Sequence, residues 1–514
     1  MKKLLLAFAA AALVYSCTCT PSASVIPDEV YADLPFAMSK VVQPTFADNT
    51  VSIADFGAKP DGLTLNTDAF HKAFDAVTEK GGGKVVVPAG IWLTGPIVLK
   101  SNVNLHVERG AVVLFSPDLS LYPLLKEKVS FEGLDTRRCQ SPISAKNAEN
   151  IAITGRGVID GSGDAWRPVK KGKMTEGQWK NLLASGGALN ARKDIWFPSE
   201  SGRKGYENAV DQNITAAKTE EEFQAIKDFM RPVMVNIVKC KNVWLDGVTF
   251  QNSPAWNIHP LMCENLTVSN LTVRNPWYSQ NGDGIDIESC KNVVVYNSSF
   301  DVGDDAICVK SGKNEEGRKR AIPTENLIVK GCLVYHGHGG FVVGSEMSSG
   351  VKNVKVSDCT FLGTDVGLRF KSTRGRGGVV ENIWISDIDM MNIPAEPLLF
   401  DLFYGGKSAI EAREAGDKPD TQMKAVDETT PQFRNIFIKN ITCNGADRAM
   451  YFNGLPEMNV QNVTVDNVVI KSTRGAEISE STDVKLSNIK IVPSKGEPIV
   501  VRSSKNVTLD GKPL

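Results

Sequence analysis

The sequence has no excess of charge of either sign. Its 514 residues carry 58 Lys and Arg against 59 Asp and Glu, so the formal net charge is −1. Nothing in this balance directs the protein as a whole towards nucleic acid, an acidic membrane or a polyanion. Any attraction for an anionic ligand must therefore be local, and we expect no nucleic-acid partner.

Metal-binding motifs are also lacking. None of the ten cysteines has the paired spacing of a zinc site, and no calcium-loop motif occurs, so we expect neither a metal nor a cofactor. Without Cys17 and Cys19 eight cysteines remain, and an exported chain permits disulfides among them. Cys240, Cys263 and Cys290, however, occupy one place in a repeated motif, which favours small apolar residues stacked in a core.

Long hydrophobic runs are limited to the N-terminus. Residues 4–14 are apolar and follow Met1-Lys2-Lys3, which is the pattern of an export signal, and the run is too short to span a membrane. The next residues, Val14-Tyr15-Ser16-Cys17, resemble a bacterial lipoprotein cleavage box. We therefore predict a signal peptide over residues 1–17, a lead segment over residues 18–50, and an exported protein that a lipid on Cys17 anchors to a membrane, in the periplasm or at the cell surface. The alternative is an ordinary signal peptide cut near residues 22–24.

A short repeat runs through the second half of the chain. Each copy has a turn residue, usually Asn, followed by apolar residues at alternate positions. Clear copies begin at Asn242, Asn265, Asn292, Asn326, Asn353, Asn382, Asn435 and Asn462, and weaker copies begin at Asp483 and Asn506. Most successive copies lie 21 to 34 residues apart.

This repeat predicts the fold. Alternating β-branched residues favour short strands, and Asn side chains satisfy backbone groups at tight turns. The copies are too short for β-propeller blades, and the Leu and Asn spacing of leucine-rich repeats is missing. We therefore predict an all-β protein, a single-stranded right-handed parallel β-helix over residues 51–514. An amphipathic helix that Asn66 caps and Gly81 ends would cover its N-terminal end.

Two segments interrupt the repeat. Residues 166–232 have helix-like sequence, including a capping-box signature from Thr219 to Glu222, and residues 405–430 are polar. Insertions in repeat proteins form loops, often around the binding face. Surface decoration without a function is the alternative, especially for the second segment.

Four polar clusters occur at intervals close to one repeat. They are Asn281-Gly282-Asp283, Gly303-Asp304-Asp305, Gly337-His338-Gly339 and Arg369-Phe370-Lys371. Residues one coil apart in a solenoid lie above one another, so the clusters predict a stripe of acids, an imidazole and two cations on one face. Each motif taken alone is more often an ordinary turn.

The acids of this stripe suit glycosidic cleavage. That reaction needs one carboxylic acid to protonate the leaving oxygen and another carboxylate to activate water or to attack the sugar. Repulsion among Asp283, Asp304 and Asp305 would raise their proton affinities, so that one of them stays protonated as the acid. His338 would tune this protonation or orient the sugar, although a histidine taken alone is more often an ordinary surface or hydrogen-bonding residue.

The cations suit a sugar that carries a carboxylate. Arg369 and Lys371 alternate about Phe370, so on a strand both cations point to one face, where they can bind a carboxylate. Arg374, Arg376 and the basic residues of the segment 310–320 would add a rim that attracts a polyanion.

In their order and spacing, the motifs resemble the polygalacturonase family of pectin hydrolases, glycoside hydrolase family 28, whose fold is the pectate-lyase-like solenoid. The resemblance runs from about Val51 to the C-terminus and implies hydrolysis of α-1,4-galacturonosidic linkages in homogalacturonan or oligogalacturonides, with inversion. It implies that Asp304 donates the proton, that Asp283 and Asp305 hold and deprotonate water, and that His338 supports the acid. The substrate-binding positions that it implies are Asn281, Arg369, Lys371 and Tyr404.

Details of the motifs resemble the bacterial exo-acting branch. Gly282 and Ala306 stand where many endo-acting relatives have Thr and Cys, and residues 344–347 and 369–378 are similar to the exo-acting enzymes. An exo enzyme needs one end of its groove closed, which the insertion at residues 166–232 could do. A rhamnogalacturonan hydrolase, a pectate lyase and a β-helix that binds carbohydrate without catalysis are the alternatives.

Overall fold

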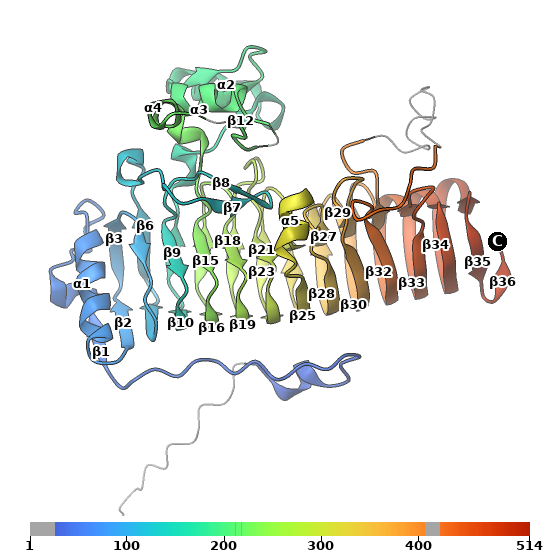
Figure 1. Ribbon diagram of the computed structural model, residues 1–514, viewed down its shortest axis with the longest axis horizontal. Coiled ribbons are helices and arrows are strands. Elements are labelled where there is room, and N and C mark those ends of the chain that lie inside the picture. Colours follow the sequence, from blue (N-terminus) through green and yellow to red (C-terminus); the bar gives the residue numbers. More distant parts are fainter. Residues whose placement is uncertain (1–25, 211, 217, 407–421) are drawn as a thin grey trace, which may run out of the picture.

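The computed structural model describes residues 26–210, 212–216, 218–406 and 422–514 of the chain. They form one long parallel β-helix with a helical lobe on one side (Figure 1), so the predicted solenoid is confirmed. The predicted signal peptide and the lipid site at Cys17 lie outside the described residues. Within them, no helix is both long and apolar enough to cross a bilayer.

Three parallel sheets make up the sides of the β-helix, and each long strand near the C-terminus takes part in more than one. The first sheet contains β1 (Thr50–Ser52), β2 (Gly83–Val87), β5 (Val103–Val107), β10 (Glu149–Gly155), β16 (Lys241–Asp246), β19 (Glu264–Ser269), β22 (Lys291–Tyr296), β25 (Thr324–Lys330), β28 (Val351–Leu362), β30 (Val379–Ile393), β32 (Gln432–Asn453), β33 (Val460–Ser479), β34 (Ser481–Arg502) and β35 (Lys505–Leu509). The second sheet contains β3 (Gly90–Thr94), β6 (Ala111–Phe115), β11 (Val158–Asp160), β17 (Thr249–Gln251), β20 (Thr272–Arg274), β23 (Ser299–Asp301) and β26 (Leu333–Val334), and continues in β28. The third sheet contains β4 (Ile97–Val98), β9 (Ile143–Lys146), β15 (Val235–Val238), β18 (Ile258–Leu261), β21 (Ile285–Glu288), β24 (Ile307–Lys310), β27 (Gly339–Gly344), β29 (Val366–Lys371) and β31 (Leu398–Asp401), and continues in β32.

The remaining elements lie at the ends of the β-helix or on its loops. The helices are α1 (Thr67–Thr78), α2 (Glu176–Ala184), α3 (Glu200–Glu207), α4 (Glu220–Ala225) and α5 (Asn314–Arg320). The short 3-10 turns are Asp28–Tyr31, Ile53–Phe56, Leu119–Leu121, Gly163–Ala165, Lys171–Lys173 and Lys227–Phe229. Antiparallel pairing joins β7 (Val129–Phe131) to β8 (Leu134–Thr136), both β12 (Val169–Lys170) and β13 (Ala188–Leu189) to β14 (Ile195–Phe197), and β36 (Lys512–Pro513) to β35.

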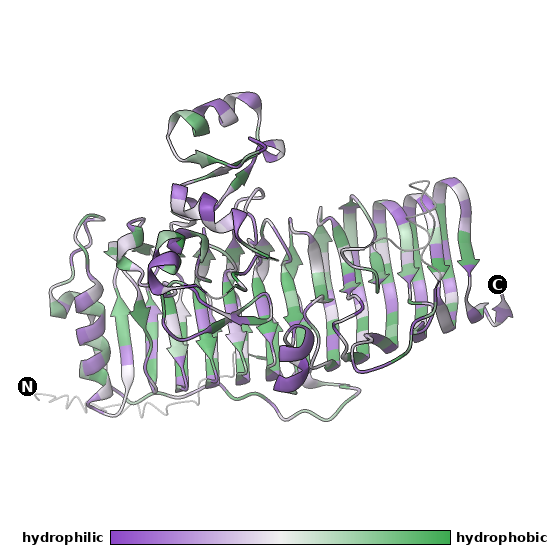
Figure 2. Ribbon diagram, turned by 45° about the horizontal axis from the view of Figure 1, so that its top comes forward, coloured by the Kyte–Doolittle hydropathy of each residue, from purple (hydrophilic) through white to green (hydrophobic). Residues whose placement is uncertain are grey.

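Inward side chains of the same kind stack from coil to coil. Val243, Leu266, Val293 and Leu327 face one another in register on successive strands, and all four are fully or almost fully buried. Hydrophobic segments of neighbouring strands accordingly lie beside one another (Figure 2). The eight described cysteines are free and buried, so the prediction that Cys240, Cys263 and Cys290 pack in the core is confirmed.

The asparagines of the repeat form a ladder. Each of the eight that begin clear copies has a positive φ between 49° and 60°, a conformation that Asn tolerates better than most residues. Each side-chain amide donates to the amide oxygen of the Asn one coil earlier, for example from Asn292 to Asn265 at 3.2 Å and from Asn326 to Asn292 at 3.1 Å. The repeated Asn therefore forms a side-chain ladder in addition to a turn.

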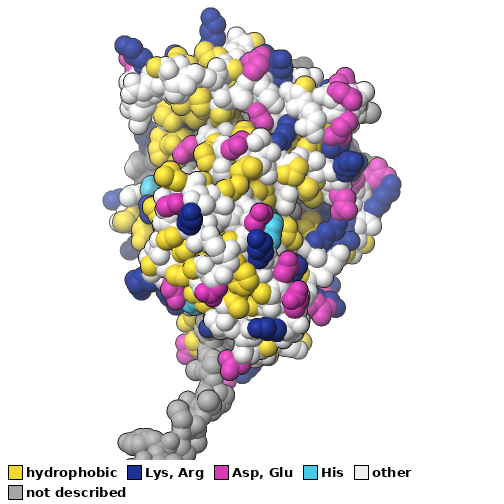
Figure 3. Space-filling view, turned by 90° about the vertical axis from the view of Figure 1, so that its left-hand side faces the viewer, with side chains coloured by type: hydrophobic (Ala, Val, Ile, Leu, Met, Phe, Trp, Pro, Cys, Tyr) yellow, Lys and Arg dark blue, Asp and Glu magenta, His cyan; other side chains and the backbone are white. Residues whose placement is uncertain are grey.

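The N-terminal end of the β-helix is covered by α1. Phe70, Phe74 and Val77 of this helix are fully buried against the first coils. Asn66 precedes the helix, but its side chain does not cap it: the amide oxygen accepts from the Lys59 backbone N–H at 2.7 Å. The predicted helix is confirmed and its side-chain cap is wrong. Seen from this end, charged groups of both signs are mixed with hydrophobic side chains (Figure 3).

The insertion at residues 166–232 forms a small lobe between β11 and β15. It contains α2 to α4, and it stands out from the β-helix on the side that also carries the β7–β8 hairpin (Figure 1). The predicted capping box is present, because the Thr219 hydroxyl accepts from the Glu222 N–H at 3.2 Å and the Glu222 carboxylate from the Thr219 N–H at 2.8 Å.

Candidate active site

The four polar clusters of the sequence follow one another along the third sheet. Asp283 precedes β21, Asp304 and Asp305 precede β24, His338 precedes β27, and Arg369 lies within β29. These strands are neighbours in parallel register, with Ile285 opposite Ile307, Ile307 opposite Phe341, and Val342 opposite Arg369. The coil spacing thus brings the predicted residues together as a stripe.

Three carboxylates form the centre of the stripe. One oxygen of each of Asp283, Asp304 and Asp305 lies within 4.8 Å of the others. Asp283 and Asp305 are buried, whereas the Asp304 side chain is 23% exposed. Asp304 is therefore the carboxyl group of the three that a substrate can reach most easily.

Two cations hold Asp305 in its ionised form. The Lys371 ammonium donates to Oδ2 at 2.8 Å, and the Arg369 guanidinium donates to Oδ1 at 3.2 Å. Burial by itself would raise the pKa of Asp305, but Lys371, Arg369 and Lys310 outweigh it and keep the pKa well below the ordinary value. Phe370 points the other way into the core and stacks on Phe400 at 4.7 Å, so the predicted alternation of this strand is confirmed.

Asp304 pairs with the histidine of the next coil. The distance from Nδ1 of His338 to Oδ1 of Asp304 is 3.0 Å. Burial would raise the pKa of Asp304, yet the hydrogen bond and charge of His338 lower it below the ordinary value. The same hydrogen bond raises the pKa of His338. Gly337 permits this approach, because its φ is +155° and a Cβ there would lie 2.8 Å from the Asp304 carbonyl oxygen.

Like-charge repulsion raises the pKa of Asp283, whereas the family resemblance assigns the role of the acid to Asp304. Burial, followed by the charges of Asp286 and Asp304, raises the pKa of Asp283 well above its ordinary value. Oδ1 of Asp283 is buried and has no hydrogen-bond partner among the described residues. The expected rise in proton affinity through repulsion is therefore seen at Asp283, whereas His338 lowers the pKa of Asp304.

Comparison with known proteins agrees with the arrangement of carboxylates expected for a glycoside hydrolase. Residues 215–488, more than half of the chain, match the family described as glycosyl hydrolases family 28. The chain belongs to this family. The family that the motifs predicted is thereby confirmed.

Several relatives of this family 28 protein have described activities. A probable polygalacturonase of Vitis vinifera is 30% identical over 350 residues, which cover 66% of this chain and 61% of that protein, less than two thirds of its length. An exo-poly-α-D-galacturonosidase of Dickeya chrysanthemi is 27% identical over 485 residues, which cover 91% of this chain and 75% of that protein. Among solved structures, a hyperthermoactive exopolygalacturonase from Thermotoga maritima superimposes with a TM-score of 0.65 at 30% identity, and the match covers 92% of this chain and 94% of that one.

A buried charged network lies beside the family 28 aspartates, and the motifs did not reveal it. The Lys310 ammonium lies 3.4 Å from Oδ1 of Asp286 and 3.1 Å from Oε2 of Glu346, and it sits 4.4 Å from the centre of the Trp256 ring. All four residues are buried. Polar residues at outward positions of strands β21 and β24 were the available signal, but outward positions of a β-helix are usually polar in any case.

Asn281 joins three segments that are distant in sequence. Its amide oxygen accepts from Arg231, at the end of the insertion, at 3.0 Å, and its amide nitrogen donates to Oε1 of Glu132 at 3.1 Å. Glu132 lies at the turn of the β7–β8 hairpin, where burial and then Glu346 raise its pKa to about 7. No motif marks Glu132, because only the folded chain places it beside the site.

Tyr404 lies next to the two cations. The Lys371 ammonium is 4.9 Å from the centre of its ring, and the Arg369 guanidinium is 5.7 Å away. The ring is partly exposed, at 37% for the residue. Tyr404 therefore borders the site where the sequence placed it, and its role in substrate binding stays a prediction.

The basic rim around the site is largely engaged in structural contacts. Arg374 binds Glu457 at 2.6 Å, Arg320 binds Glu288 at 2.5 Å, and Arg318 donates to the carbonyl of Gly375 at 2.7 Å. These contacts hold loops together, and the attraction of the rim for a polyanion stays a prediction. Arg369 and Lys371 are likewise paired, with Asp305, and their binding of a sugar carboxylate also stays a prediction.

The three aspartates are also close enough to hold a cation. However, Asp305 already binds Arg369 and Lys371, and the positive charge of Lys310 also acts on Asp305. A divalent ion would therefore meet protein cations at the face where it would have to bind, and the donor set fits a metal poorly.

Replacing His338 by Gln should shift the pH dependence of turnover. In the wild type, the His338–Asp304 pair holds a proton up to the raised pKa of the imidazole. In His338→Gln the proton resides on Asp304 alone, a weaker base, so the basic limb of the kcat profile should move to lower pH, with a loss of about 10²-fold at neutral pH. A pH–rate profile of both proteins checks this, and an unchanged basic limb would mean that the pair does not supply the proton.

Proposed function

We propose that this protein hydrolyses α-1,4-galacturonosidic linkages of pectin, in homogalacturonan or oligogalacturonides. The observation that carries the proposal is the juxtaposition of three carboxylates with two cations. Carboxylates at this spacing can protonate a leaving oxygen and activate water. Arg369 and Lys371, which lie at the same point, supply the positive charge that a galacturonate carboxylate requires.

In the proposed mechanism Asp304 protonates the leaving oxygen. His338 returns a proton to Asp304, because its imidazole nitrogen lies 3.0 Å from the carboxylate. Asp305, which is held ionised, accepts a proton from the attacking water, and Asp283 helps to hold that water. Lys371 and Arg369 then have two roles, since they keep Asp305 ionised and face the sugar carboxylate.

We propose that the reaction inverts the anomeric carbon, on the basis of the family resemblance. The separation of the oxygens, within 4.8 Å, is closer to the roughly 5–5.5 Å of retaining enzymes than to the roughly 6.5–9.5 Å of inverting ones. Inversion at this spacing requires that water occupy a position held jointly by Asp283 and Asp305, to one side of Asp304.

We further propose that the protein acts from a chain end. The insertion supports this: Trp179 and Trp196 of the lobe pack around Tyr278, three residues before Asn281, and Arg231 binds Asn281 itself. These contacts place the lobe beside one end of the aspartate stripe. The described activity of the Dickeya and Thermotoga relatives is also exo-acting.

A time course of digestion tests both the substrate and the direction of attack. Polygalacturonate and short oligogalacturonides are incubated with the enzyme without added metal, and the products are separated by size. Saturated monomer from the start, with little early loss of viscosity, is expected. Proton NMR of the first product should show the β-anomer, and the α-anomer would contradict inversion.

Other product patterns would point to the alternatives. A ladder of oligomers would mean an endo-acting enzyme, and unsaturated products would mean a lyase. Cleavage of rhamnogalacturonan fragments alone would move the assignment to the rhamnose-containing backbone. No cleavage of any of these would favour a β-helix that binds carbohydrate without catalysis.

We also propose that the protein is exported and anchored by a lipid on Cys17. The support is the charged and apolar pattern of residues 1–17, which lie outside the described part of the chain. Radiolabelled palmitate should enter the wild-type protein in a bacterial host and should not enter Cys17→Ser. Equal labelling of both would exclude this anchor.

A further inference from the structure

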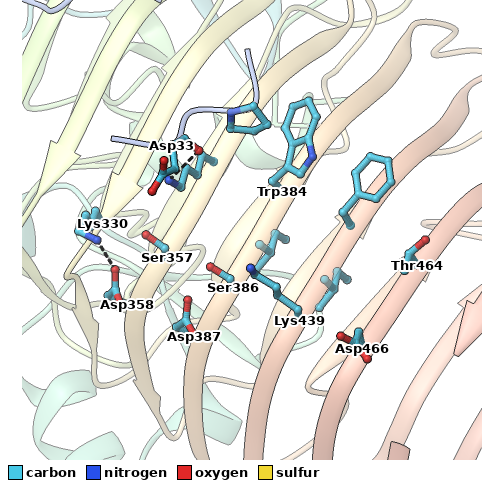
Figure 4. Close-up of a pocket in the computed structure, with 15 residues that line it drawn as sticks. Asp33, Lys330, Ser357, Asp358, Trp384, Ser386, Asp387, Lys439, Thr464 and Asp466 are labelled. Atoms are coloured by element: carbon cyan, nitrogen blue, oxygen red, sulfur yellow. Dashed lines mark hydrogen bonds and ion pairs between the residues drawn. The ribbon is translucent and has the colours of Figure 1, made fainter. Parts of the chain in front are cut away.

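A second groove lies on the first sheet, on a different side of the β-helix from the aspartates. Its volume is about 610 Å³, within the roughly 300–1,000 Å³ of ligand-binding pockets. It crosses β25, β28, β30, β32 and β33, and the segment around Asp33 and Pro35 forms one edge (Figure 4). Nothing in the proposed mechanism uses this groove.

Two parallel rows of outward side chains form the floor of the groove. In the first row Lys355, Trp384, Phe437 and Thr464 face one another on successive strands. In the second row the corresponding residues are Ser357, Ser386, Lys439 and Asp466. Because successive coils are about 4.8 Å apart, the floor repeats along the helix axis. Such a floor suits a ligand that is itself a repeating chain.

An aromatic surface lies in the middle of the first row. The rings of Trp384 and Phe437 are nearly parallel, with 13° between their planes and 5.7 Å between their centres. Both side chains are partly exposed. The negatively polarised face of an aromatic ring attracts the C–H groups of a sugar, and an indole N–H can donate to a hydroxyl. The Trp384 N–H has no hydrogen-bond partner among the described residues.

The edge of the groove is fixed by the N-terminal segment. The Lys355 ammonium donates to the carbonyl of Ala32 at 3.1 Å, and Phe36 packs against Trp384 with 5.7 Å between the ring centres. Further along, Val30 and Val41 of the same segment are buried in one hydrophobic cluster with strand residues. The groove is thus formed in the free protein, so binding requires little ordering of side chains.

The charges of the groove favour an uncharged ligand. Three lysines line it, at positions 330, 355 and 439, against four aspartates at positions 33, 358, 387 and 466. Lys330 is paired with Asp358, and Lys355 is engaged by backbone carbonyls. Beyond that ion pair two lysines stand against three aspartates, so the groove has no excess of positive charge to attract galacturonate. Hydroxyl groups of a neutral sugar can bind to the carboxylates that line the groove.

We propose that this groove is a carbohydrate-binding site for a neutral oligosaccharide chain that lies along the helix axis across Trp384 and Phe437. Such a site would hold the protein on neutral glycans while the aspartates act elsewhere. The site is separate from the catalytic residues, so its test does not depend on the proposed hydrolysis.

Calorimetric titration with neutral tetrasaccharides of β-1,4-galactan, α-1,5-arabinan and β-1,4-glucan tests the proposal. We expect at least one of them to bind wild-type protein, and both Trp384→Ala and Phe437→Ala to weaken that binding at least fivefold. Phe437→Ala is needed because Trp384→Ala also removes a contact of the N-terminal segment. Trp244→Ala is the matched control, since Trp244 lies in the same outward row on β16 and outside the groove.

The outcomes are separable from those of the active site. Hydrolysis of short oligogalacturonides should be unchanged in Trp384→Ala and Phe437→Ala. The proposal is overturned if none of the three tetrasaccharides binds, or if their affinity is the same in Phe437→Ala. It is also overturned if tetragalacturonate, tested in the Asp304→Asn background, competes with the neutral sugar for this groove.

Discussion

Replacing Asp304 by Asn is expected to abolish turnover while binding and folding persist. The amide cannot donate the proton that the leaving oxygen requires, and loss of a general acid of this kind costs about 10²–10⁴-fold in kcat. The exchange preserves size, and the side chain is 23% exposed, so little packing is lost. Initial rates on oligogalacturonides, together with oligogalacturonide binding by calorimetry, measure the two effects separately.

Asp301→Asn is the matched control for this substitution. Asp301 lies three residues earlier, at the end of β23, is partly exposed, and binds His336 at 2.8 Å outside the aspartate stripe. Its exchange should leave turnover within about twofold of the wild type, because surface substitutions of this kind have small effects. Near-normal turnover of Asp304→Asn would refute the assignment of the acid.

Replacing Lys310 by Met is expected to destabilise the fold and to shift the acid limb of activity. The substitution leaves Asp286 and Glu346 buried without their shared cation, and breaking a buried ion pair in this way costs about 3–5 kcal/mol. Lys310 also helps to lower the pKa of Asp305. Without Lys310 the pKa of Asp305 is higher. The acid limb of the pH–rate profile should therefore move to higher pH.

Lys490→Met provides the comparison for stability. Lys490 is an exposed lysine on β34, so its exchange should change the free energy of unfolding by less than about 0.5 kcal/mol. Urea unfolding of the three proteins gives the free energies, and a pH–rate profile gives the acid limb. Equal stability of Lys310→Met and Lys490→Met would mean that the buried carboxyl groups are protonated and need no cation.

The repeat predicted the backbone well because its signal is local. An Asn with positive φ, followed by alternating apolar residues, specifies one turn and one strand, and the same pattern recurs in each coil. The register of the Asn ladder, from Asn265 to Asn462, follows because identical residues stack on one another in successive coils. For the same reason the coil spacing was enough to place Asp283, Asp304 and His338 on one face.

The interactions of the site residues were harder to predict. The sequence placed Arg369 and Lys371 towards a substrate, but both also bind Asp305 two coils earlier. Asn66 was expected to cap α1, and its side chain instead binds the Lys59 backbone. In each case the side chain binds a group other than the expected one, and the local sequence pattern does not indicate that group.

By itself, the sequence determined the solenoid, its N-terminal helix and the order of the four polar clusters, because coil period and turn chemistry depend on neighbouring residues. The tertiary structure alone decided in which direction the pKa of each carboxyl group shifts, since the shifts depend on burial and on the charges of Lys310, His338 and Lys371. It also decided that Glu132, Asn281 and Arg231 meet, and that Trp384 and Phe437 form one surface. These features arise from contacts between distant segments, and such contacts exist only after the coils have stacked.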